Sequence, residues 1–181
     1  GGTAGGKTLQ YAIDLLEEEG KDNKKQAFEI IKSLAEEGDS EAFIVLGNFY
    51  RLGMGVSKDF KESVKWYRLA AEQGQSGGMS WLGRMYKDGL GVLKDSKEAI
   101  KWYSLAIENG ASKSALGPEI VEAQFNLGMM YWKRDGDGDI ETANKWLRLA
   151  AEQGYAEAQF NLGRMTFAGP TTLKWYRLAA E

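Results

Sequence analysis

Apolar residues recur at intervals of three and four positions over much of the chain, which is the spacing of one face of an α-helix. Two segments near the N-terminus, residues 8–19 and 23–37, show this spacing. Residues 40–52 and 60–73 follow as a second pair, separated by a glycine-containing connection. We therefore predict that the chain consists of helices in consecutive pairs, without strands.

The second helix of that pair carries a sequence that returns along the chain. It reads WYRLAAEQG at 66–74, WYSLAIENG at 102–110 and WLRLAAEQG at 146–154, and a partial copy begins at Trp175. The first helix carries a Leu-Gly signature, whose motif glycines are Gly47, Gly83, Gly128 and, in a weaker copy, Gly163. In the first two units both signatures return after 36 residues, from Trp66 to Trp102 and from Gly47 to Gly83. A period of this length is typical of a helical repeat array, and the recurring aromatic residues are predicted to form its core.

The unit from Glu41 to Gly74 resembles the Sel-one-like repeat (SLR) family, a relative of the tetratricopeptide repeat. The family pattern is A-x-A-x-x-x-L-G-x-x-Y-x-x-G-x-G-V-x-x-D-x-x-x-A-x-x-W-Y-x-x-A-A-E-x-G, and this unit fits it almost throughout. The resemblance covers about Asp39 to Glu181. It implies an all-α fold, a right-handed α/α superhelix (solenoid) of about five antiparallel helix pairs.

The repeats also predict the domain organisation. Residues 1–6 are expected to be a flexible leader or a cloning remnant, and residues 7–181 a single SLR solenoid. The expected parts of the solenoid are a degenerate N-terminal cap pair at 7–38 and repeats at 39–74, 75–110, 111–154 and 155–181.

Two repeats depart from the period. Gly83 and Gly128 are 45 residues apart, which indicates an insertion at 112–120. An insertion at one turn of a solenoid projects from one face and offers an alternative binding edge. The last repeat lacks the usual turn between Gly163 and Trp175 and stops before the Gln-Gly that ends two of the other copies. Its uncapped end is expected to associate with further repeats or a partner.

Several local patterns favour structural roles. Residues 1–8 match a phosphate-binding loop, but no strand precedes them as that motif requires. Asp59 and Asp95 are placed to cap the second helices of their repeats. The acidic run 135–139 resembles a calcium loop, yet Ile140 stands at the sixth position, where glycine is needed. An irregular, weak calcium site at this run stays open as an alternative.

Composition narrows the functional classes. The chain has no cysteine and no histidine, so disulfides, thiol nucleophiles, the usual zinc ligands and the commonest general acid-base residue are all missing. Its acidic residues fall at caps, loops and exposed helix positions, whereas a catalytic carboxylate needs a cleft that perturbs it. We expect no enzyme activity, no catalytic residue, no metal and no cofactor. A hydrolase that uses paired carboxylates is the less favoured alternative.

Net charge, apolar runs and cysteine content indicate which partners and which cellular compartment the sequence favours. A formal net charge of -3 gives no general case for nucleic-acid binding. No apolar run is long enough to predict a membrane span. The absence of cysteine is compatible with both a bacterial periplasm and a cytoplasm, so the compartment stays unassigned.

The resemblance to tetratricopeptide repeats implies that the first helix of each repeat lines a concave surface. Its non-core positions lie one, four and five residues after the motif glycine, and they hold five cations and one anion. The partner-binding residues predicted from these positions are Asn48, Arg51, Arg84, Lys87, Met129, Trp132, Lys133, Arg164 and Phe167.

A basic surface with apolar anchors suits a protein partner or an acidic or carboxylate-terminated peptide. The alternative interpretation is that these cations are ordinary solvated helix charges. The resemblance implies a non-catalytic protein-interaction scaffold or adaptor. A dedicated inhibitor or immunity partner of a single enzyme, a role known for bacterial members of the family, is the alternative.

Overall fold

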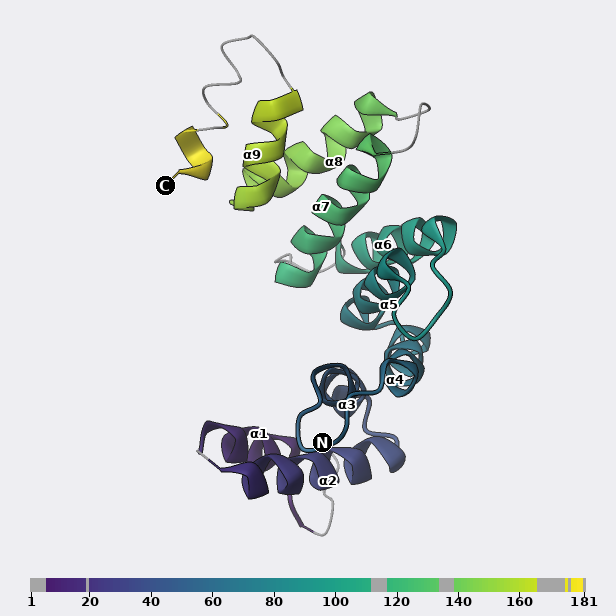
Figure 1. Cartoon of the computed structure of the whole chain (residues 1–181), viewed down its shortest axis with the longest axis vertical. Coiled ribbons are helices and arrows are strands. Elements are labelled where there is room, and N and C mark those ends of the chain that lie inside the picture. Colours follow the sequence, from purple (N-terminus) through teal and green to yellow (C-terminus); the bar gives the residue numbers. More distant parts are fainter. Residues whose placement is uncertain are drawn as a thin grey trace. The chain divides into compact units, whose positions relative to one another are not determined.

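The computed structural model describes residues 6–18, 20–111, 117–133, 139–165, 175 and 177–180. Within these residues no strand forms, and the all-α prediction is confirmed. The bounded helices are α1 (Leu9–Glu17), α2 (Lys21–Glu36), α3 (Ser40–Leu52), α4 (Phe60–Glu72), α5 (Ser76–Asp88), α6 (Ser96–Ala111), α7 (Pro118–Trp132), α8 (Ile140–Glu152) and α9 (Ala156–Met165) (Figure 1). Residues 175 and 177–179 are also helical and belong to the tenth predicted helix.

The chain forms two compact units, residues 1–95 and 96–181. In the first unit each helix from α1 to α5 packs against the next one in sequence, and in the second unit the same holds from α6 to α9. Helices α3, α5, α7 and α9 carry the Leu-Gly signature and are called the A helices below. Helices α4, α6 and α8 carry the Trp-Tyr or Trp-Leu signature and are called the B helices.

Two of the motif glycines, Gly47 and Gly128, lie where a B helix approaches the backbone of an A helix. A Cβ atom on Gly47 would stand 2.5 Å from Cε1 of Tyr67, and one on Gly128 would stand 2.7 Å from Cγ of Leu147. Tyr67 and Leu147 are both fully buried. Because the glycine has no side chain, it leaves room for the second residue of the B-helix signature, Tyr67 or Leu147, to pack against the A helix.

The two positions of that signature differ in burial. Tyr67 and Tyr103 are inaccessible to solvent, as predicted for core aromatics, and Trp66 is also buried. The prediction of a buried tryptophan in every repeat is wrong for Trp102 and Trp146, which are only partly buried. The tryptophan stands beside the Tyr or Leu that packs on the A helix, at the margin of the core. The lysine before it lies over its ring in three repeats, Lys65, Lys101 and Lys145.

The Gly-x-Gly connections are inter-helix turns, as predicted. Gly53 ends α3 in the left-handed region, with a φ of 71°. Gly55, at φ 66°, lies so close to the start of α2 that a Cβ would collide with the carbonyl oxygen of Lys24. Gly91 lies in the same way against the carbonyl oxygen of Phe60 at the start of α4. The second glycine of each of these two turns therefore allows the loop to pack on the start of an earlier helix, which is α2 for Gly55 and α4 for Gly91.

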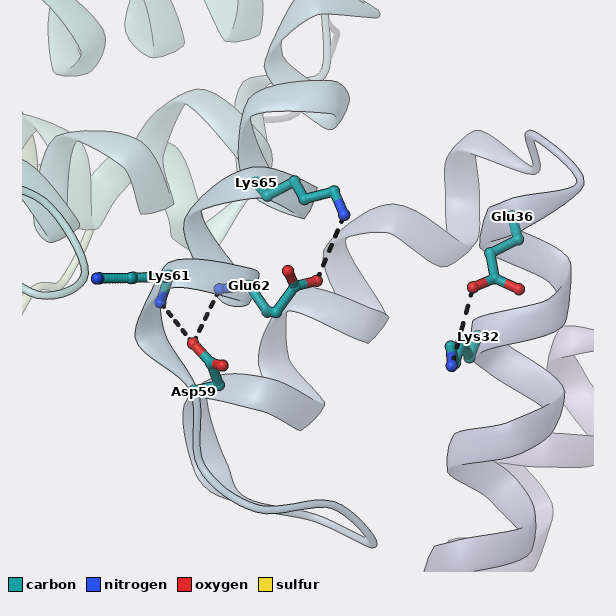
Figure 2. A network of polar contacts seen from close by, with 6 residues as sticks. All are labelled: Lys32, Glu36, Asp59, Lys61, Glu62 and Lys65. Carbon is teal, nitrogen blue, oxygen red and sulfur yellow. Dashed lines mark hydrogen bonds and ion pairs between the residues drawn. The ribbon is translucent and has the colours of Figure 1, made fainter.

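Aspartate caps set the start of the B helices. One carboxylate oxygen of Asp59 accepts hydrogen bonds from the backbone N–H groups of Lys61 and Glu62, at 2.9 and 3.1 Å (Figure 2). Asp139 accepts the backbone N–H of Thr142 at the start of α8, and this hydrogen bond together with one from the Thr142 hydroxyl lowers the pKa of its carboxyl. The capping role predicted for Asp59 is confirmed, and Asp139 caps α8 in the same way. Residues 112–116 of the predicted insertion and 134–138 of the acidic run lie outside the described residues.

Candidate protein-binding surface

The last turns of α3 present a polar group that reaches α4. Asn48 and Arg51 are three residues apart, so they share one side of the helix. The hydroxyl of Tyr67 donates to Oδ1 of Asn48 at 2.7 Å and accepts from Nε of Arg51 at 3.2 Å. Nη2 of Arg51 adds a longer contact of 3.5 Å to the same Asn48 oxygen. The three polar groups therefore form a closed triangle.

Helix α5 places an aromatic ring against this triangle. The Trp81 side chain stacks on the Tyr67 ring, with centroids 5.5 Å apart and planes at 10°. The guanidinium carbon of Arg51 lies 4.2 Å from the centroid of a Trp81 ring, and that of Arg84 lies 5.4 Å from it. The set Asn48, Arg51, Tyr67, Trp81 and Arg84 is called the Trp81 cluster below. It brings two cations onto one partly buried aromatic residue.

The charges around the cluster are unequally compensated. Asp88 lies 3.8 Å from Nε of Arg84 and 3.3 Å from Nζ of Lys87, so one carboxylate serves both of these cations. Arg51 has no carboxylate within ion-pair distance among the described residues. Its positive charge is therefore offset only by dipoles and by the ring beneath it.

Burial raises the pKa of the Tyr67 hydroxyl above its ordinary value of 10.0, and the nearby Arg51 cation opposes part of that rise. The hydroxyl consequently stays protonated at neutral pH. It acts as a donor to Asn48 and as an acceptor from Arg51 at the same time.

The second unit has a related arrangement on α7 and α9. Trp132 is the last residue of α7, and the guanidinium carbon of Arg164 on α9 lies 5.6 Å from the centroid of its ring. Met129, one turn earlier, packs partly against the core of this unit. Lys133 is exposed at the end of α7. Phe167 lies outside the described residues.

The predicted residues thus fall into two groups, one in each unit. Asn48, Arg51 and Arg84 gather around Trp81, while Trp132 gathers with Arg164. Trp81 was missed because it lies two residues before the motif glycine, outside the register used for the prediction. A signal was available, since the other repeats have Val45, Asn126 and Asn161 at that position.

Neither a metal site nor a membrane span is found in the described part of the chain. Its Asp and Glu side chains form no group of three that could hold a metal ion. None of its helices combines the length and the apolar character needed to cross a bilayer.

Comparison with known proteins connects the repeats to a family. The Sel1 repeat family model matches residues 41–75, 76–110, 121–155 and 156–181. A comparison with curated proteins found no match.

Solved structures give the same result. A Sel1 repeat protein from Oxalobacter formigenes is 31% identical with a TM-score of 0.74, over 86% of this chain and 62% of its own. The protective antigen c5321 of uropathogenic Escherichia coli strains, which has an SLR fold, is 24% identical with a TM-score of 0.73, over 95% of this chain and 40% of its own. This chain therefore spans less than two thirds of the length of either protein. With four matched repeats and a shared fold, the chain belongs to the Sel1 repeat family.

Proposed function

We propose that this chain is a non-catalytic protein-interaction scaffold that binds an acidic segment of a partner protein on its A helices. Sel1 repeat proteins generally act in protein–protein interaction, and the family typically consists of non-enzymatic scaffolds. The observation that carries the proposal is that arginines stack on a tryptophan in both units. Arg51 and Arg84 lie over Trp81, and Arg164 lies over Trp132.

Stacking prepares an arginine for a carboxylate. A guanidinium that lies over an indole makes a favourable cation–π contact, and this contact leaves the N–H groups in its plane available for hydrogen bonds. A carboxylate accepts two of these N–H groups in parallel, and such charge-assisted pairs are stronger than neutral hydrogen bonds. The tryptophan at the same time supplies the large aromatic contact area typical of residues that dominate binding energy. An acidic segment with an apolar side chain can pair with the arginine through its carboxylate and pack on the tryptophan through its apolar side chain.

The test begins with peptides selected from a random displayed library on the wild-type chain. We expect the enriched peptides to be acidic. The double variant Arg84→Glu/Arg164→Glu should bind them at least about tenfold more weakly, because like charges now face each other. The melting temperature should change little, since exposed charges contribute little to folding.

Lys61→Glu is the matched control. Lys61 is exposed, has no carboxylate partner among the described residues, and lies in the first turn of α4 with its side chain directed away from Asp59 and Glu62 (Figure 2). It should leave affinity near the wild-type value. Trp132→Ala should weaken binding at low and high salt alike, whereas added salt should weaken the wild-type complex. Enrichment of neutral peptides, or full binding by the double reversal, would contradict the proposal.

Two finer alternatives make different predictions about partners. An adaptor should capture several proteins from the source cell, and a dedicated inhibitor should capture one.

If changes at residues 112–120 abolish binding while the double reversal binds normally, the insertion edge is the binding site. Association through the last repeat predicts a concentration-dependent increase in mass for the isolated chain, which sedimentation would show.

A further inference from the structure

We propose that Arg51 is a preorganised receptor for a single carboxylate, and that Tyr67 and Asn48 are the residues that position it. This inference rests on the proposed function, because it assigns one group of the partner to one residue of the same surface. It goes further by naming the chemical group that is bound and the residues that prepare the site.

The argument starts from the five N–H groups of a guanidinium, which point in fixed directions in one plane. Its side edge consists of the Nε and Nη2 groups, and its end edge consists of the Nη1 and Nη2 groups. In Arg51 the side edge is occupied, since Nε donates to the Tyr67 hydroxyl and Nη2 donates to Asn48 Oδ1. The end edge, with two parallel N–H groups, has no carboxylate partner among the described residues.

One face of the guanidinium is also in contact, with the Trp81 ring centroid 4.2 Å from Cζ. Trp81 in turn is stacked on the buried ring of Tyr67. Arg51 is thus held by the indole at its Cζ and by the hydroxyl and the amide along its side edge. An arginine held in this way loses little side-chain freedom when it binds, which favours affinity.

A carboxylate is the ligand that fits this end edge. It is planar, its negative charge matches the Arg51 cation, which has no carboxylate partner among the described residues, and its two oxygens match two parallel N–H groups. The neighbouring cations Arg84 and Lys87 are already near Asp88. The carboxylate can come from a Glu or Asp side chain or from a C-terminus, since both present the same two oxygens.

The equivalent positions in the third repeat show that the receptor is not a general property of the repeat. Counted from the motif glycine, Asn48 and Arg51 correspond to Met129 and Trp132. The residue that corresponds to Tyr67 is Leu147, which has no hydroxyl. The polar triangle of the first repeat is therefore replaced by apolar side chains in the third.

The test titrates the full chain with short peptides and follows the Arg51 Nε–H and Trp81 indole N–H signals by NMR. The probes are acetyl-Gly-Glu-Gly-amide, acetyl-Gly-Gly-Gly with a free C-terminus, and the neutral acetyl-Gly-Gln-Gly-amide. Saturable shifts with one or both carboxylate peptides and none with the neutral peptide are expected. The two carboxylate peptides distinguish a side chain from a C-terminus as the source. Inorganic phosphate is a fourth probe, and tighter binding of phosphate would overturn the assignment to a carboxylate.

Variants then test the preorganisation. Arg51→Lys keeps the charge but loses the planar fork, and Tyr67→Phe keeps the stacked ring but loses the hydroxyl; each should weaken carboxylate binding by about fivefold or more. Arg68→Lys is the matched control, because Arg68 also donates to a tyrosine hydroxyl, that of Tyr86 at 3.0 Å, but has no stacked tryptophan. It should bind as the wild type does.

The outcomes separate this inference from the proposed function. If Arg51→Lys and Tyr67→Phe bind as the wild type does while Arg84→Glu/Arg164→Glu does not, the receptor is wrong and the acidic-partner surface stands. If the neutral peptide produces the same shifts, the carboxylate assignment is wrong. If every one of these variants binds the probe peptides and the selected peptides as tightly as the wild type does, both proposals fail. Should Tyr67→Phe lose its fold by circular dichroism, the surface variant Arg51→Lys still decides the result.

Discussion

At the scale of single residues, Tyr67 joins the core to the surface. Its ring fills the space beside Gly47 and is fully buried, while its hydroxyl reaches Asn48 and Arg51 at the edge of the cluster. The same side chain therefore packs two helices together and orients a cation. The packing of the Tyr67 ring and the contacts of its hydroxyl can therefore be tested with separate substitutions.

Gly47→Ala tests the packing. The new Cβ would lie 2.5 Å from the Tyr67 ring, so the ring or the helix must move, and such overpacking costs about 1–3 kcal/mol. The better helix propensity of alanine offsets up to about 1 kcal/mol of this. We expect a net loss of stability in urea unfolding. The control is Gly77→Ala, whose Cβ would meet only the terminal methyl of Ile44 at 3.0 Å. Equal effects of the two substitutions would contradict the role of the motif glycine.

Tyr67→Phe tests the hydroxyl through pH. Because burial raises the pKa of Tyr67 in the folded chain above 10.0, the folded state holds the phenolic proton more tightly than the unfolded state. Its stabilising effect is therefore complete below pH 10 and is lost as pH rises toward the folded pKa. Urea unfolding between pH 8 and about 11 should show the wild type losing stability relative to Tyr67→Phe. A constant difference between the two proteins over that range would show that Tyr67 is not perturbed.

At the scale of helices and loops, the two Gly-x-Gly turns at 53–55 and 89–91 depend on their second glycine. Gly55 has a positive φ and lies on the backbone of α2, and Gly91 has the same relation to α4. Each of these loops thus packs its repeat against an earlier helix, α2 for Gly55 and α4 for Gly91. This contact explains why the Gly-x-Gly turn accompanies the helical signatures.

Gly55→Ala should be more destabilising than its backbone conformation alone requires. A left-handed φ costs an alanine about 1–2 kcal/mol, and the collision with the Lys24 carbonyl adds to that cost. Gly74→Ala is the matched control, because Gly74 has a φ of 75° but no atom within 4 Å of the added Cβ. Thermal unfolding should place Gly55→Ala clearly below Gly74→Ala. Similar melting temperatures would mean that the loop moves away from α2 without cost.

At the scale of the whole molecule, the two units present different chemistry on their A helices. The first unit offers the cationic and polar Trp81 cluster, and the second offers Trp132 with Arg164 and the partly buried Met129. If the proposed function is right, we expect the first unit to bind an acidic group and the second unit to bind an apolar side chain. This division follows from the substitution of Asn48 and Arg51 by Met129 and Trp132 at matching positions.

The sequence by itself determined the family, the all-α fold and the approximate bounds of the first four helices, because a repeat places the same small and aromatic residues at the same contacts several times. Tyr67 and Tyr103 could be assigned to the core for that reason, and Asp59 could be recognised as a cap because capping is local. The sequence also indicated which positions of the A helices carry cations.

Only the tertiary structure decided how those cations are held. Arg51 and Trp81 are 30 residues apart, and their contact depends on the packing of α3, α4 and α5 against one another. Periodicity indicates which face of a helix a residue occupies, but it does not indicate which side chain of the next repeat lies across from it. The hydroxyl of Tyr67 shows the same limit, since a core position in the repeat pattern gave no sign that its polar end contacts Asn48 and Arg51. Orientation of the candidate site comes from contacts between repeats, which depend on the three-dimensional packing of side chains that vary from one repeat to the next.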